Sequence, residues 1–199
     1  QHPEWTAWVK QFADWLLTAQ RPDGSFPEVF EGSTGKPRSD SGGTSYAAVP
    51  FLVRMSRQSG GSQYLDAATR AANFVWATYG KDGVYVGATG GDVADKESGM
   101  LSMQAFLDLN DATKDRTWLD RAKSAADYTE SYIWLWNVPM PSGLADSELG
   151  WKHGVSTVGV TGIASNVPGE VDEYLDWAAP LYAQLYKETN DQHYLDVAC

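Results

Sequence analysis

The 199-residue chain lacks three features that define common classes of protein. It has a single cysteine, Cys199, so it can form neither an internal disulfide nor a cysteine-rich zinc site. No apolar run reaches the ~18 residues that a membrane-spanning helix needs. Positive charge is scarce, and the formal net charge is −11. Nucleic acids and anionic membranes both attract basic patches, so we expect neither as a partner.

The first residues also lack a signal-peptide pattern. They read QHPEWTAWVKQF, without a basic segment followed by an apolar one. A leader could have been removed, and cysteine usage leaves the compartment open. The sequence therefore does not determine the location, and we slightly favour a secreted or periplasmic one. Aromatic residues, in contrast, are abundant, with nine Trp and ten Tyr. Such an excess is typical of sugar-binding surfaces, although aromatic side chains also fill hydrophobic cores.

Three segments of the chain repeat one pattern, which predicts helical hairpins. Each has an apolar stretch with helical spacing, a short polar turn, and then an aromatic-Leu-Asp motif. The motifs are Tyr64-Leu65-Asp66, Trp118-Leu119-Asp120 and Tyr194-Leu195-Asp196. The turns carry Gly, Asn or Asp, which end one helix and start the next. We expect helices over residues 4–19, 45–58, 63–79, 97–113, 117–135 and 172–189 and from 192 onward, with no substantial sheet.

The connections between hairpins are long, whereas the turns within them are short. The long ones cover about residues 21–44, 80–96 and 137–169. Each leaves a returning helix and leads into a forward helix, so all should lie at one end of an antiparallel array. The sequence thus predicts an all-α fold, an (α/α)6-type toroid, as one partial domain over residues 1–199. Six hairpins at this spacing need roughly 350 residues, so we expect about half a ring, with the remainder of the toroid or another chain on its open edge.

The second long connection gathers three carboxylates before a forward helix. The stretch GATGGDVADKESG places Asp92, Asp95 and Glu97 there. The helix dipole favours acidic groups at this position, so simple capping explains them. Three carboxylates after a glycine-rich stretch exceed what capping needs, and glycine permits close approach of a ligand. A ligand site and a helix cap therefore both remain open.

The other two long connections carry further polar and aromatic candidates. The first ends in GGTSY, which contains Tyr46. The third contains Trp151 and His153, followed by Glu170 and Asp172 before the next forward helix. A lone histidine is more often solvated or hydrogen-bonded than catalytic. No second histidine stands at metal-ligand spacing, so we expect no metal and no cofactor.

Paired carboxylates across a cleft with aromatic walls suit the cleavage of a glycosidic bond. One carboxyl protonates the leaving oxygen, and the other activates water or attacks the sugar. Asp95 and Asp172 are the predicted acid/base pair, with Glu97 as the alternative. We expect both aspartates at one end of the array, on neighbouring forward helices. The predicted substrate-binding residues are Tyr46, Trp151, His153, Asp92 and Glu170.

Several stretches resemble the six-hairpin glycosidase superfamily of bacterial carbohydrate-active proteins. They span most of the chain: QRPDGSF, GDVADKESGMLSMQAFLDL, the YLDAA and WLDRA hairpins, YIWLWNVPMP, and VSTVGVTGIAS followed by GEVDEYLDWAAPLY. The more specific match is Asp95 to Gly99. Relatives often carry Gly-His-Ser before the later Asp, where this chain reads Asn166-Val167-Pro168, while Asp172 still matches. The resemblance implies a toroid with a glycan substrate.

The reaction is not determined by this resemblance, because hydrolases, lyases and epimerases share the ring. A glycoside hydrolase acting on a polysaccharide or oligosaccharide is the leading interpretation. A polysaccharide lyase acting on a uronate-containing glycan is the first alternative. It needs a base and a cation to neutralise the uronate carboxylate, and the acidic cluster would repel such a substrate. A non-catalytic glycan-binding scaffold is the second alternative.

Overall fold

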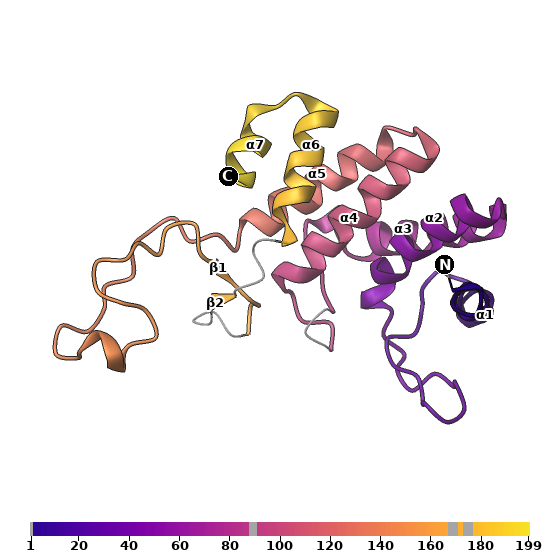
Figure 1. The fold of residues 1–199 in the computed structure, drawn as a ribbon, viewed down its shortest axis with the longest axis horizontal. Coiled ribbons are helices and arrows are strands. Elements are labelled where there is room, and N and C mark those ends of the chain that lie inside the picture. The colour runs from indigo at the N-terminus through magenta and orange to yellow at the C-terminus, as the bar shows by residue number, and fades with distance from the viewer. Residues whose placement is uncertain (1, 88–90, 167–170, 173–176) are drawn as a thin grey trace.

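The computed structural model describes residues 2–87, 91–166, 171–172 and 177–199. Helical hairpins dominate this part of the chain (Figure 1). The α-helices are α1 (Pro3–Ala19), α2 (Ala48–Ser59), α3 (Ser62–Thr78), α4 (Lys96–Thr113), α5 (Thr117–Glu130), α6 (Ala179–Thr189) and α7 (Gln192–Ala198). Short 3-10 helices are η1 (Gly43–Ala47), η2 (Gly80–Asp82) and η3 (Asp146–Glu148). One small antiparallel sheet joins β1 (Thr161–Gly162) to β2 (Val171–Asp172), with Thr161 opposite Asp172.

The three hairpins turn by the same local device. Each forward helix ends at a residue in the left-handed conformation, namely Gly60 after α2, Lys114 after α4 and Asn190 after α6. The backbone N–H of each of these residues bonds back to a carbonyl four residues earlier in its helix, which closes the helix end. Turns of different sequence therefore produce the same reversal.

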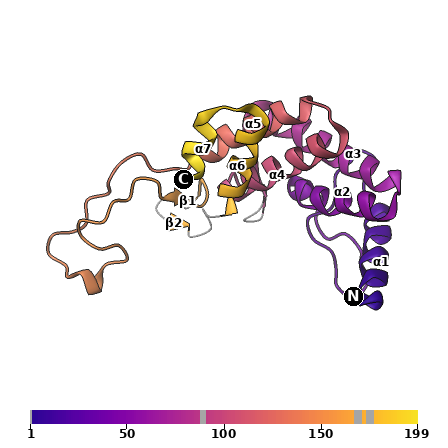
Figure 2. The same cartoon turned by 45° about the horizontal axis from the view of Figure 1, so that its top comes forward.

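The hairpins are arranged as an open arc of two layers. The forward helices contact one another in order, since α4 packs against both α2 and α6. Each returning helix packs on its own hairpin partner, and α3 and α5 also contact the forward helix that follows them. Figure 2 shows the arc, with α1 at one end and the α6–α7 hairpin at the other. The all-α, half-ring toroid expected from the sequence is confirmed.

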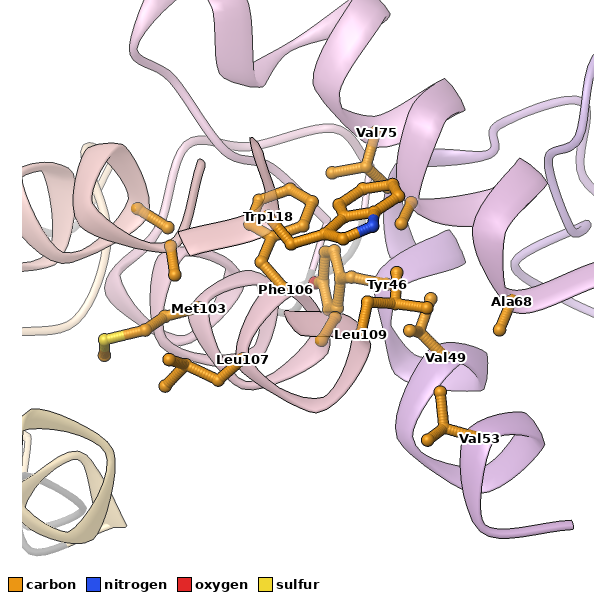
Figure 3. Close-up of a cluster of buried hydrophobic side chains, with 14 of the residues drawn as sticks. Tyr46, Val49, Val53, Ala68, Val75, Met103, Phe106, Leu107, Leu109 and Trp118 are labelled. Atoms are coloured by element: carbon orange, nitrogen blue, oxygen red, sulfur yellow. The ribbon is translucent and has the colours of Figure 1, made fainter. Parts of the chain in front are cut away.

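The core lies between the two layers and is built from small and large side chains together. Alanines on the buried faces of α3 and α5 let these helices approach closely. Large side chains fill the remaining space, and Figure 3 shows Tyr46, Phe106, Leu109 and Trp118 among them. The Phe106 and Trp118 rings stack at 6.1 Å between centroids, which ties α4 to α5. No helix in the described ranges is both long and apolar enough to cross a membrane.

The two largest differences from the expected helix bounds both border the third long connection. The helix expected over 117–135 stops at Glu130, because the chain then becomes extended and pairs with residues 160–162. Its β-branched and aromatic sequence, Tyr132 to Trp136, suits that conformation. The helix expected from 172 begins at Ala179, with Pro180 in its first turn. Asp172 lies instead in β2, so its placement on a forward helix was wrong.

Candidate functional site

Asp95 is the N-cap residue of α4. Its backbone is extended, and its Oδ1 accepts hydrogen bonds from the backbone N–H and the hydroxyl of Ser98, both at 2.7 Å. This satisfies one of the donors that a helix N-terminus leaves free. The residue is fully buried. The capping interpretation of Asp95 is therefore confirmed, and any chemistry at this carboxylate takes place in a position that the fold holds rigidly.

A buried tyrosine extends the hydrogen bonding of Asp95. The hydroxyl of Tyr46 lies 3.0 Å from the Ser98 hydroxyl. Since Ser98 gives its only hydroxyl hydrogen to Asp95, Tyr46 must be the donor to Ser98. Burial raises the pKa of Tyr46, which keeps its hydrogen in place. The sequence analysis expected Tyr46 to contact sugar, but the residue is 2% exposed and packs in the core, where it reaches Asp95 through Ser98.

Tyr128 in the last turn of α5 and Tyr132 just after the helix are close enough to feel the charge of the same carboxylate. Tyr128 donates from its hydroxyl to the Tyr85 carbonyl at 2.8 Å, and Tyr132 lies 2.9 Å from it, hydroxyl to hydroxyl. Burial is the main cause that raises the pKa of both Tyr128 and Tyr132. The negative charge of Asp95 raises it further. Sequence reasoning missed this pair. Their spacing of four residues, one helical turn, was the available signal.

An extended segment crosses the start of α4 and links it to β2. Lys96 N donates to the Ile163 carbonyl and Ser165 N donates to the Ala94 carbonyl, each at 2.9 Å, so Asp95 lies opposite Ala164. Three residues earlier, Thr161 lies opposite Asp172. The backbone of Asp172 is thus at the same end of the array as Asp95. Glu170, which sequence reasoning assigned to substrate binding, lies outside the described residues.

Asp92 joins two of the long connections. It is exposed, has a left-handed backbone with φ of 56°, and its Oδ1 accepts a hydrogen bond from the Ser41 hydroxyl at 2.7 Å. The Tyr79 hydroxyl donates to the same oxygen at 3.4 Å. A Cβ at Gly43 would lie only 2.5 Å from that oxygen, so a larger residue there would displace the Asp92 carboxylate. Asp92 therefore holds loops together beside the start of α4, where half-buried Glu97 also lies.

Trp151 and His153 are far from this cluster. They belong to a segment that projects away from the helices in both views (Figures 1 and 2), called here the projecting arm, residues 134–160. His153 Nδ1 lies 2.7 Å from Asp146 Oδ1, and its Nε2 lies 3.1 Å from the Pro141 carbonyl oxygen. Trp151 donates from Nε1 to the Val155 carbonyl. This contact holds Trp151 within the arm, and the structure does not bring it together with Asp95.

No group of three His, Cys, Asp or Glu side chains able to hold a metal ion occurs in the described part of the chain. The end of the array at the start of α4 instead carries a cluster of carboxylates and hydroxyls. It is supplied by α4, α5, η1 and the extended segment, elements that are distant in sequence and adjacent in space. Such a constellation can position carboxylic acids for proton transfer and can hydrogen-bond a polyhydroxylated ligand.

No protein-family model matches the chain, and no curated protein matches it in sequence. In structure the chain is similar to a GH76 α-mannanase from Bacteroides thetaiotaomicron, with a TM-score of 0.54 and 16% sequence identity over 82% of this chain. The two proteins share the fold of an α/α toroid. The chain spans 45% of the length of that mannanase, which agrees with a half ring. At this identity the likeness shows the fold alone, and the activity must be argued from the site.

Proposed function

We propose that this chain carries part of the active site of a glycoside hydrolase. The observation that supports this most is the pairing of segment 161–165 with the start of α4. It brings the backbone of Asp172 to the end of the array where Asp95 and Glu97 lie. Glycosidases need two carboxyl groups on opposite sides of the scissile bond, supplied here by separate segments. The same end carries every long connection, so it is where a substrate has room to bind.

The carboxylates differ in position, which suggests different roles. Asp95 is fully buried and oriented by Ser98 and Tyr46, so it is suited to hold one fixed geometry. Glu97 is half-buried in the first turn of α4 and stands nearer to solvent. We assign acid/base chemistry to Asp95 together with Asp172, and Glu97 is the alternative partner. The structural likeness makes α-mannan the first substrate to try.

The test is product release from α-mannan, xylan and pullulan, with a polyuronate in parallel. We expect new reducing ends and no absorbance from unsaturated sugars. Asp95→Asn, Glu97→Gln and Asp172→Asn are compared with Asp120→Asn, an exposed aspartate on α5. Asn caps a helix about as well as Asp, so Asp95→Asn should fold normally while losing turnover. Full activity of Asp95→Asn and Asp172→Asn would exclude both carboxylates from the chemistry, leaving Asp95 only its role as a helix cap.

Two other results would redirect the assignment. Unsaturated products from the polyuronate would show a lyase. Binding of a polysaccharide with no product of either kind would show a non-catalytic glycan-binding scaffold. Circular dichroism of each variant separates lost chemistry from lost fold.

A further inference from the structure

The base of the projecting arm presents a pair of parallel indole rings. Trp134 and Trp136 stack with their ring planes 8° apart and their centroids 6.1 Å apart. They are two residues apart on extended chain, so they share one side of it, and Leu135 points to the other. Trp134 is half-buried, whereas Trp136 is 59% exposed. An exposed indole supported from behind by a second ring is a preformed flat apolar surface.

The surface is held in place by a polar frame. Trp134 donates from its backbone N–H to the Val160 carbonyl at 2.7 Å and accepts from Gly159 N–H at 2.9 Å. Next to Trp136, the Oδ1 of Asn137 accepts hydrogen bonds from the Ser156 hydroxyl at 2.8 Å and from Thr157 N–H at 3.0 Å. These bonds orient the amide, so its NH2 group can serve as a donor to a hydroxyl beside the rings.

The position of the pair connects it to the candidate site. Trp134 is hydrogen-bonded through its backbone to Val160. Asp95 lies opposite Ala164, which follows Val160 on the same extended segment. An extended chain rises about 3.3 Å per residue, so the four steps between Val160 and Ala164 span roughly 13 Å. A chain of sugar rings can bridge that distance. The structure therefore places a flat aromatic surface within reach of any oligosaccharide held at the carboxylates.

We propose that Trp134 and Trp136 form a glycan-binding platform that holds a sugar ring of the substrate outside the scissile bond. This rests on the proposed function for the carboxylates, and it adds a specific subsite to it. The apolar faces of a pyranose ring pack on the exposed face of Trp136, and its hydroxyls remain available to Asn137 and to solvent. Trp134 is a positioning residue, because it supports the ring that contacts the sugar.

Affinity electrophoresis of the full chain in gels containing α-mannan, xylan or pullulan tests the platform. The comparison is Trp136→Ala against Leu135→Ala, since Leu135 is 79% exposed on the same stretch and faces away from the rings. Trp136→Ala should weaken retardation by about tenfold or more, the scale of losing an aromatic anchor, while Leu135→Ala leaves it unchanged. If hydrolysis occurs, Trp136→Ala should raise KM on the polysaccharide with little change in kcat.

The results also separate this inference from the proposed function. Equal retardation of the wild type and Trp136→Ala, or no retardation of the wild type by any of the three polysaccharides, overturns the platform. A change of native mass in Trp136→Ala would overturn it as well, by showing that the ring contacts another protein chain. Retardation that depends on Trp136 without any product release would keep the platform and overturn the hydrolase.

Discussion

Gly99 is the residue whose replacement best tests the packing behind the candidate site. A Cβ there would lie 2.5 Å from Cδ1 of Tyr128 and 2.6 Å from Oγ1 of Thr129. Overpacking costs about 1–3 kcal/mol, and the better helix propensity of alanine returns up to ~1 kcal/mol. We expect Gly99→Ala to lower the free energy of unfolding by about 1–2 kcal/mol in a urea titration. It should also displace Tyr128, and so lower turnover by more than the stability loss explains.

Gly150→Ala is the matched control for this change. A Cβ at Gly150 meets nothing within 4 Å, so its effect should stay within about 0.5 kcal/mol. A Gly99→Ala protein as stable as the wild type would show that α4 and α5 are less tightly packed at this point than the structure indicates.

At the scale of elements, the projecting arm contains a pH-dependent contact. Hydrogen bonds to Asp146 and to the Pro141 carbonyl raise the pKa of His153 above its ordinary 6.5, and the His153 bonds lower the pKa of Asp146 below 3.8. The contact of protonated His153 with Asp146 therefore stabilises the arm. The contribution of the histidine is fully present below pH 6.5 and is lost as the pH rises through the raised pKa of His153. The lowered aspartate pKa adds stability above pH 3.8 that is lost in stronger acid.

An NMR titration of the His153 ring measures this contact directly. We expect a midpoint above 6.5 in the wild type and a lower one in Asp146→Asn, because the amide carries no charge to stabilise the imidazolium. Protection of arm amides from hydrogen exchange should fall over the same pH interval in the wild type only. The same midpoint in both proteins would mean that Asp146 does not determine it.

At the scale of the whole molecule, the arc ends in an apolar face on α1. Trp5, Trp8 and Phe12 are each more than half exposed on that helix. A contiguous apolar patch on an isolated chain usually marks an interface. We expect this face to be covered by the remainder of a ring or by another chain, so the native mass should exceed 21.8 kDa.

Size-exclusion chromatography with light scattering measures that mass. Changing Trp5, Trp8 and Phe12 together to serine should lower the native mass, or reduce the binding of an apolar dye. The helical circular dichroism signal should stay the same. Changing Val155 and Val158 of the arm to serine is the control, because they are exposed apolar residues outside α1. A monodisperse 21.8 kDa wild-type monomer that binds no dye would contradict an open, covered edge.

The hairpins could be predicted from sequence because their causes are local. Helical spacing of apolar residues and a turn residue able to adopt the left-handed conformation act within about ten residues, and Gly60, Lys114 and Asn190 occupy equivalent positions. The carboxylates at the start of α4 could be recognised because helix-capping signals are also local. Composition and repeat length also determined the class of fold, an all-α half ring.

Only the tertiary structure decided what those carboxylates contact. The burial of Asp95, its support by Tyr46 and the approach of Tyr128 depend on segments 30 or more residues away, which a local pattern does not encode. The same holds for Asp172, which has a helical context in sequence but pairs with Thr161 across a chain reversal. The placement of Trp151 and His153 in the projecting arm, away from α4 (Figures 1 and 2), was likewise decided only by the tertiary structure. At Asp172, backbone pairing across the reversal outweighed the local helix propensity.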